Sequence, residues 1–292
     1  MQRMPLLLCS SKLPTLQRVL TQCYPESLKV CGALHNIINE NPFKLQVLVD
    51  QWPNFTSVVC RPRLEDMTDP TDQYTNTYFM YSKDQQMLSD MLQDPQTINW
   101  SHKIQIQGCQ PALGEVLRDV SAKYKSSIKT TSNILYTRES IQSTEEADLL
   151  STLSSKDLQF SSLSLDEAPP VNAEWGFGGN ELSLRYVERC IQKCPTLCIR
   201  KRGVGPPLAW VLSEQSAEQR MGYTHQDYRN QGLFRIMVIK IAMIIQSRGG
   251  PLYCHVAPDN KRSQAATLKA GFNVRGRWMQ WNVLPMQPKP KI

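Results

Sequence analysis

The stretch EQRMGYTHQDYRNQGLFRI, residues 218–236, contains the pattern that decides the fold. A short β-like run is followed by the turn Arg-Asn-Gln-Gly at 229–232 and then by an apolar, helix-like sequence. Such a turn directs the unpaired N–H groups of the helix N-terminus outward, where the helix dipole is positive. Gly232 allows a positive φ angle, and Arg229 adds a charged donor. The stretch therefore predicts an anion site, although Arg-x-x-Gly also occurs at ordinary helix starts.

The rest of the second half alternates between helix and strand patterns. Asn180 is a candidate N-cap, Glu181 falls in the first turn, and Leu184, Val187 and Ile191 form an apolar helix face. The segments predicted after it are a hairpin of PLAWVLSE and EQRMGYT, a helix in GLFRIMVIKIAMIIQSRGG, a strand in LYCHVAP, a helix in NKRSQAATLKAGF closed by Gly271, and a strand in RWMQWNVLP.

The first half has an α+β pattern. KVCGALHNII (29–38), KLQVLVD and TSVVC are strand-like, and DMTDPTDQYTNTYFMYSKD is a polar turn followed by an aromatic strand. Helical patterns follow around 84–93 and 111–124. Residues 139–170 are rich in Ser, Thr and acidic residues and poor in aromatics, so we expect a linker there, with room for short helical or strand pieces.

Length and composition narrow the class of protein. A chain of 292 residues predicts roughly one or two domains. The longest apolar run, at 236–245, contains Lys240 and is shorter than the ~20 residues that cross a bilayer, so we expect no membrane span. The net charge of +7 fits an anionic ligand. The basic residues are scattered without interleaved aromatics, which argues against nucleic acid as a partner.

The cysteines favour a reducing compartment. Nine cysteines without a secretory signal make a poor disulfide framework. Cys190, Cys194 and Cys198 are evenly spaced, but Pro195 ends a helix between them and no His or second Cys pair follows at zinc spacing. We interpret the cluster as structural and predict no metal site.

The N-terminal segment allows two compatible interpretations. Residues 1–24 contain Arg3, Lys12 and Arg18 and no acidic residue, as in transit peptides. The same segment also fits a first helix with Leu13, Leu16, Leu20 and Tyr24 on one face. Both interpretations hold if the segment directs the protein to an organelle without being cleaved.

The order of elements resembles the acetyl-CoA-binding core of the GNAT acyltransferase superfamily over about residues 205–284. The turn at 229–232, the long helix, the next strand, Asn260 and Gly271-Phe272 carry this resemblance. It implies that the coenzyme A pyrophosphate lies on the turn and that the preceding strand binds the pantetheine arm. The residues it marks as binding the coenzyme are Met221, Tyr223, Arg229, Asn230, Gln231, Gly232, Leu233, Phe234 and Asn260.

A closer resemblance covers both halves. PESLKVCGALHNIINENPFKLQVLVDQWPNF, INWSHKIQIQG, FGGNELSLRYVERCIQ and WMQWN are similar to segments of the glycine N-acyltransferase family. The resemblance implies an α+β chain of two GNAT-like domains, each a mixed twisted sheet flanked by helices. The expected boundaries are a degenerate domain at 1–138, the linker at 139–170 and the catalytic domain at 171–292.

This family resemblance also implies the reaction. An acyl group would pass from acyl-CoA, a co-substrate rather than a permanently bound cofactor, to the amino group of glycine, or of glutamine in some members. We expect a monomer that conjugates amino acids in detoxification. The implied location is the mitochondrial matrix, with the cytoplasm or the endoplasmic reticulum as alternatives.

The general base is open to three candidates, because the ammonium of an amino acid must lose a proton before its nitrogen can attack. The family pattern implies a glutamate two residues before the turn arginine, where this chain has the shorter Asp227. Glu218 stands where many GNAT enzymes have their glutamate base, and His225 is a third candidate. The chain also has Phe234 where the superfamily usually has Gly or Ala, and Leu268 where many GNAT enzymes have a tyrosine acid.

These departures leave two other functions open. A non-catalytic acyl-CoA-binding protein would fit Asp227 and the missing tyrosine. A protein or polyamine acetyltransferase would use the same core, but the first half resembles the glycine family rather than histone-type enzymes.

Overall fold

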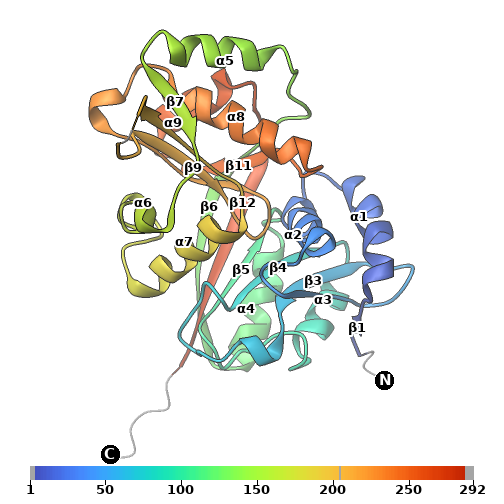
Figure 1. Ribbon diagram of the computed structural model, residues 1–292. Coiled ribbons are helices and arrows are strands. Elements are labelled where there is room, and N and C mark those ends of the chain that lie inside the picture. Colours follow the sequence, from blue (N-terminus) through green and yellow to red (C-terminus); the bar gives the residue numbers. More distant parts are fainter. Residues whose placement is uncertain (1–3, 204, 287–292) are drawn as a thin grey trace, which may run out of the picture. The chain divides into compact units, whose positions relative to one another are not determined.

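The computed structural model describes residues 4–203 and 205–286, which form two compact units (Figure 1). The first unit consists of Met1–Asn133 and Arg277–Ile292, and the second unit is the intervening Ile134–Gly276. Helices pack on the strands of each unit, and each unit has its own hydrophobic core. Within the described ranges, no helix is long and apolar enough to span a membrane.

The sheet of the first unit has the order β1-β2-β3-β4-β5-β12. Only β4 and β5 run parallel among the pairs of this sheet in the described chain. Its strands are β1 (Leu6–Leu7), β2 (Leu45–Val49), β3 (Ser57–Pro62), β4 (Thr77–Ser82), β5 (Ile104–Gly108) and β12 (Asn273–Pro285). Its helices are η1 (Ser10–Lys12), α1 (Leu13–Thr21), α2 (Leu28–Asn39), η2 (Leu64–Asp66), α3 (Gln85–Leu92) and α4 (Leu113–Lys123).

The sheet of the second unit has the order β7-β8-β9-β10-β11-β6, and β10 and β11 are its parallel pair. Figure 1 shows α8 on one face of this sheet and α6 and α7 on the other. Its strands are β6 (Ser126–Thr137), β7 (Leu158–Ser161), β8 (Thr196–Lys201), β9 (Ala209–Ser213), β10 (Gln219–Thr224) and β11 (Tyr253–Val256). Its helices are α5 (Glu145–Ser154), η3 (Leu165–Glu167), α6 (Ala168–Glu174), α7 (Glu181–Lys193), η4 (Gln226–Tyr228), α8 (Leu233–Ser247) and α9 (Lys261–Lys269).

The last strand of each half pairs with the sheet of the other half. Strand β12 follows α9 in the chain but pairs with β5, from Met279↔Gly108 to Val283↔Ile104. Its Trp281 is fully buried in the core of the first unit. Strand β6 follows α4, and its residues from Ile134 to Thr137 pair with β11. The first unit is therefore built from two separate segments of the chain, and the second unit is one continuous segment between them.

The structure departs from the predicted elements at residues 29–38. This apolar run was expected to be a strand but forms most of α2, in which every residue from Leu28 to His35 is buried. A helix that is buried on nearly all sides has a continuous apolar sequence, which resembles that of a buried strand. The prediction for this segment is wrong.

The stretch expected as a linker, 139–170, contains α5, β7 and the first residues of α6. Leu149, Leu153 and Leu158 from this stretch are buried in the core of the second unit. Three well-placed leucines thus anchor a segment whose overall composition is that of a linker. The expected helix within residues 1–24 is present as α1, with Leu13, Leu16 and Leu20 buried; residues 1–3 lie outside the described residues.

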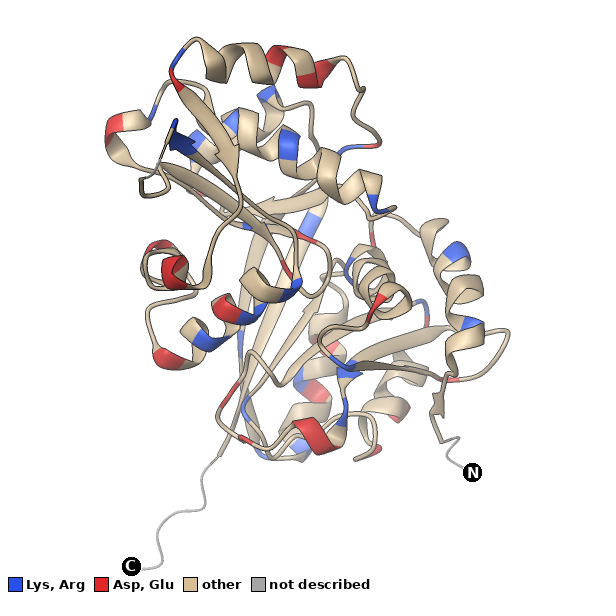
Figure 2. Ribbon diagram, viewed as in Figure 1, with Lys and Arg blue, Asp and Glu red and all other residues tan. Residues whose placement is uncertain are grey.

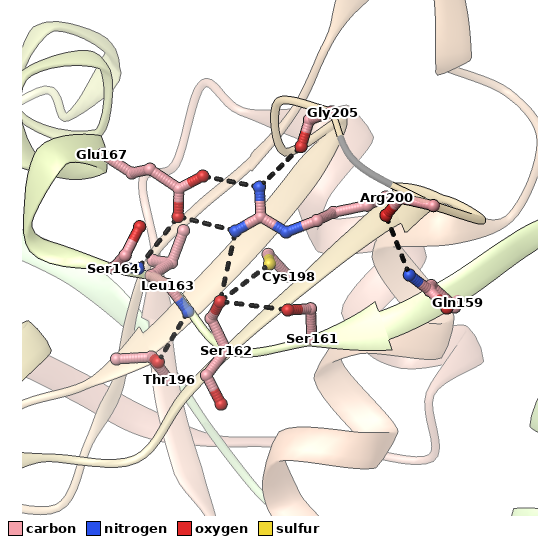
Figure 3. A network of polar contacts seen from close by, with 11 residues as sticks. Gln159, Ser161, Ser162, Leu163, Ser164, Glu167, Thr196, Cys198, Arg200 and Gly205 are labelled. Carbon is pink, nitrogen blue, oxygen red and sulfur yellow. Dashed lines mark hydrogen bonds and ion pairs between the residues drawn. The ribbon is translucent and has the colours of Figure 1, made fainter.

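Polar contacts hold the segment between β7 and α6 against β8 (Figure 3). Both guanidinium Nη atoms of Arg200 bind the carboxylate of Glu167, at 2.5 and 2.7 Å, and also donate to the carbonyls of Gly205 and Ser162. Burial alone would raise the pKa of Glu167, but its hydrogen bonds to Arg200 and to the Ser164 backbone lower it. The same pair raises the pKa of Arg200, so both groups are held in their charged forms.

Candidate functional site

Strand β10 separates from its parallel neighbour soon after it begins. It pairs with β11 at Gln219↔Cys254, the one pair between these strands in the part of the chain that the structure describes. On its other side, the register with β9 shifts between Arg220 and Tyr223. Met221 lies within this bulge and has a positive φ of 57°. A bulge bends and twists a strand, so β10 diverges from β11 beyond Gln219.

The turn after β10 leads into α8 without a side-chain cap. Gly232 is the N-cap residue, with a φ of 81°, and Asn230 also has a positive φ, of 64°. A Cβ atom on Gly232 would meet no heavy atom within 4 Å, so the left-handed backbone rather than crowding requires the glycine. The first N–H groups of α8 have no partner within the helix, which is the arrangement that binds anions.

The bulky Phe234 is accommodated by a second glycine. A Cβ atom on Gly222 would lie 2.8 Å from the Phe234 ring. The Phe234 ring therefore occupies the space that a side chain at position 222 would need. This contact explains how the turn tolerates an aromatic residue where the superfamily pattern has a small one.

A cavity of about 830 Å³ lies beside this turn, within the second unit. Four cationic side chains and one carboxylate are among its lining residues. Three of the four cations lie on α8 and α9, whose sequences contain no acidic residue, and Figure 2 shows α8 with basic residues alone. The charged lining residues are Arg229, Arg235, Arg262, Lys269 and Glu174.

The cations at the cavity are oriented by backbone carbonyls. Arg229 Nε donates to the carbonyl of Thr224 at 3.0 Å, and its guanidinium lies 5.6 Å from the ring centroid of Tyr223. Arg235 Nε donates to the carbonyl of Lys269 at 2.8 Å, which joins the start of α8 to the end of α9. Both hydrogen bonds use the Nε atom of the arginine.

Seven of the nine residues predicted to bind the coenzyme line this cavity. They are Tyr223, Arg229, Asn230, Gly232, Leu233, Phe234 and Asn260. Asn260 also caps α9, because its Oδ1 accepts from the backbone N–H of Ser263 at 3.0 Å. Met221, only 7% exposed, and Gln231 are not lining residues. The carbonyl of Gln231 accepts a hydrogen bond from Lys156 Nζ at 3.1 Å.

The two predicted catalytic carboxylates lie in opposite surroundings. The side chain of Asp227 is 69% exposed and lies 3.5 Å from His225, and it is not a lining residue. The side chain of Glu218 is fully buried, and its Oε1 lies 2.6 Å from Nδ1 of His255. The cavity therefore does not bring these two carboxylates together.

Buried polar residues that sequence reasoning missed surround Glu218. Arg220 is 6% exposed, and its guanidinium lies 5.4 Å from the rings of Trp175 and Phe177. The Phe177 ring lies edge-on to His255, with their centroids 6.4 Å apart. Glu218 and Arg220 alternate along β10, which is the signal that places them on one face. The register between β10 and β11 cannot be read from sequence, so His255 could not be placed beside them.

No cluster of three or more His, Cys, Asp or Glu side chains suited to a metal occurs among the described residues. Leu268, which stands where many GNAT enzymes have a tyrosine, is 50% exposed. Tyr223 and Tyr228 are the tyrosines that line the cavity.

Comparisons with known proteins agree with this architecture. Against glycine N-acyltransferase of Bos taurus, the chain is 37% identical over 287 residues, which cover 94% of this chain and 97% of that protein. A Drosophila protein of solved structure superposes with a TM-score of 0.73 at 14% identity, covering 97% of this chain and 99% of that one. A GCN5-related N-acetyltransferase-like protein from Streptococcus suis gives 0.52 at 11% identity, covering 94% and 99%. These structures confirm the predicted α+β GNAT fold.

The family comparison extends over nearly the whole chain. The model described as aralkyl acyl-CoA:amino acid N-acyltransferase matches residues 4–195, and the model of its C-terminal region matches residues 201–285. The chain belongs to the aralkyl acyl-CoA:amino acid N-acyltransferase family.

Proposed function

We propose that this enzyme transfers an acyl group from acyl-CoA to the amino group of glycine, giving an N-acylglycine and CoA. Family membership and the relatives named glycine N-acyltransferase support the reaction. The observation that carries it is the cavity at the uncapped N-terminus of α8, with its four cations. Coenzyme A is a polyanion, so its phosphates suit both the helix dipole and these side chains.

The substrate lies in the cavity with its pyrophosphate on the backbone amides of residues 231–234. Arg229 reaches the phosphates from the turn. The pantetheine arm follows β10 into the space that opens where β10 leaves β11, because backbone groups freed at the bulge can pair with its amides. The thioester then lies beyond Gly222, toward the face of the sheet that carries α6 and α7.

The reaction requires a neutral amine about 3 Å from the thioester carbon and donors for the developing oxyanion. Backbone N–H groups of the diverging β10 act as those donors. The pKa of an amino acid's ammonium is well above 7, so a base must accept its proton. No tyrosine acid is needed, because a thiolate whose conjugate thiol has a pKa of about 8.5 is a tolerable leaving group.

Glu218 is the base in this proposal, and Asp227 is the alternative that the family pattern implies. Burial and the 2.6 Å contact with His255 support Glu218, because a water-excluded carboxylate held in one orientation can take the proton in a fixed geometry. Exposure of 69% counts against Asp227, because a solvated carboxylate has no fixed orientation toward a substrate.

The test is to measure thiol release from benzoyl-CoA, phenylacetyl-CoA and acetyl-CoA with glycine, glutamine and a short peptide offered in parallel. We expect release with glycine and an aralkyl thioester, and no release with the peptide. If thiol release is fastest with glutamine, the acceptor is glutamine and not glycine. Acyl-CoA binding without release to any acceptor would identify a non-catalytic binding protein.

The proposal extends to the mitochondrial matrix as the location. The acid-free residues 1–24 and nine cysteines that are all free thiols support it. Since Leu13, Leu16 and Leu20 belong to a core, the segment would act without cleavage. Cell fractionation that finds the protein only in the secretory lumen, with paired cysteines, would contradict this location.

A further inference from the structure

We infer that His255 is a positioning residue for Glu218, and that the two side chains accept the proton of the incoming amine as one unit. The inference rests on the proposed function and adds to it a residue that neither the sequence patterns nor the family resemblance indicated. It rests on where the strands place the two side chains, on the charges buried with them, and on the aromatic cover above them.

The pairing of β10 with β11 fixes the geometry. Gln219 pairs with Cys254 across the parallel strands. Glu218 immediately precedes Gln219, and His255 immediately follows Cys254. Neighbouring residues of a strand point to opposite faces, so Glu218 and His255 both project from the face opposite to Gln219 and Cys254. Their side chains meet at 2.6 Å, with Glu218 fully buried and His255 9% exposed. The imidazole thus fixes the orientation of the carboxylate.

The buried cluster around the pair contains charges of both signs. Glu214 and Glu218 are fully buried, and Arg220 is the buried cation on the same face. Burial alone would lower the pKa of Arg220, but Glu218 and Glu214 raise it, so the guanidinium stays charged. The carboxylate of Glu218 lies against the His255 ring, so a proton taken up by the pair can rest on the imidazole with an opposite charge beside it, which favours proton transfer into the pair.

Two other titratable groups near the pair, Tyr186 and Cys254, are held in their neutral forms. Tyr186 donates its hydroxyl hydrogen to Glu214 at 2.9 Å, and burial raises the pKa of Tyr186. Burial and the nearby Glu218 raise the pKa of the Cys254 thiol, which keeps it neutral. Arg189, half-buried on α7, lies 6.0 Å from the ring of Tyr186.

An aromatic cover separates the pair from solvent and adjoins the cavity. Trp175 and Phe177 follow directly after Glu174, which lines the cavity, and they lie over Arg220 and His255. Because water is largely excluded, the electrostatic interactions within the cluster are stronger than they would be at the surface. Neither Glu218 nor His255 is among the lining residues of the cavity, so the amine reaches its base past this cover.

The proton balance is as follows. The ammonium gives one proton to the Glu218 and His255 pair, and its nitrogen then forms the new C–N bond with the thioester carbon. The C–S bond breaks, and its electron pair leaves on the sulfur of coenzyme A. The second proton on nitrogen goes to that thiolate, so the products are the amide and the free thiol. The pair returns the first proton to water.

The experiment measures kcat, acyl-CoA affinity and the pH profile from 6 to 9.5 for the full-length protein and three variants. We expect His255→Gln to lower kcat by about 10- to 100-fold near neutral pH with unchanged acyl-CoA affinity. The defect should shrink as the pH rises, because more of the glycine then arrives deprotonated. Glu218→Gln should lose more, and the double variant should be no worse than Glu218→Gln, since residues that act as a unit are not additive.

The matched control is His35→Gln, which removes another largely buried imidazole, 8% exposed, on α2 of the first unit. It should leave kcat and the pH profile unchanged. A His255→Gln profile parallel to the wild type, or a double variant whose losses multiply, would overturn the inference while the proposed function stands. If the wild type transfers no acyl group to any amino acid, both fall together.

Discussion

Both units contain a strand, a turn and a helix in the same order, with a parallel strand beside the first strand. The two units differ in how long the parallel strands stay paired and in how the helix begins. In the first unit β4 leads into α3, and in the second β10 leads into α8. Strand β4 stays paired with β5 over three successive residues, from Thr77↔Gln105 to Phe79↔Gln107. Strand β10 pairs with β11 at one described position and then bulges away.

The N-termini of α3 and α8 also differ, because one has a side-chain cap and the other has none. The carboxylate of Asp84 accepts hydrogen bonds from the backbone N–H groups of Gln86 and Met87, so the N-terminus of α3 is occupied by its own side chain. The N-terminus of α8 begins at Gly232 and has no side-chain cap. A phosphate competes for these same donors. The start of α8 is therefore open to an anionic ligand, because it has no side-chain cap and the strands beside it separate, whereas the start of α3 is already occupied.

The largest expected effect comes from placing a carboxylate at the open helix start. Gly232→Asp and Gly232→Asn both introduce residue types that tolerate a positive φ, but only aspartate adds a negative charge. We expect Gly232→Asp to weaken acyl-CoA binding about a hundredfold relative to Gly232→Asn, roughly 2.7 kcal/mol, because the charge repels the pyrophosphate. Isothermal titration with both variants measures the difference. Equal dissociation constants would show that the phosphates bind elsewhere.

A smaller effect concerns the stability of the second unit in acid. The pKa of Glu167 is lowered in the folded state, so its contribution is present above the unfolded pKa and is lost as the pH falls through the folded pKa. Glu167→Gln should lower the free energy of unfolding by about 2 kcal/mol at pH 7, with less difference from the wild type below about pH 4. Urea unfolding at several pH values measures this.

The control for that prediction is Asp66→Asn in the first unit, which breaks the more exposed ion pair with Lys44. Its cost should stay below about 0.5 kcal/mol. A Glu167→Gln deficit that does not change with pH would mean that packing, rather than the charge on Glu167, is responsible.

The smallest effect belongs to the helix start that is already occupied. Asp84→Ala removes the cap of α3 and should cost about 1 kcal/mol of stability, the usual cost of a lost N-cap. Acyl-CoA binding should not change, since the described residues that line the cavity at α8 all belong to the second unit. Thermal unfolding and titration calorimetry on the same sample test both parts. A loss of affinity in this variant would contradict the division of roles between the two helix starts.

The turn before α8 was predictable because neighbouring residues encode it. The environment of residues 29–38 and the position of His255 were not, because they depend on contacts between distant parts of the chain. Gly232 and the apolar helix after it identify the site because a strand, a turn and a helix are encoded within 19 neighbouring residues. The segment at 29–38 was misassigned because its residues are buried on nearly all sides. His255 escaped notice because its importance depends on its register with Glu218, 37 residues away.

Because β12 follows the second unit in the chain but pairs with β5 of the first unit, a truncation near the C-terminus would damage the first unit. A stop codon after residue 276 would remove only the last 16 residues, all of them beyond the elements that line the cavity. Yet those residues include Trp281 and Val283, which are fully buried in the core of the first unit, and the strand that pairs with β5. Removing these 16 C-terminal residues would thus expose the edge of β5 and leave a cavity in the core of the first unit. For the same reason, the two halves expressed as separate polypeptides should each lack a strand until they are mixed.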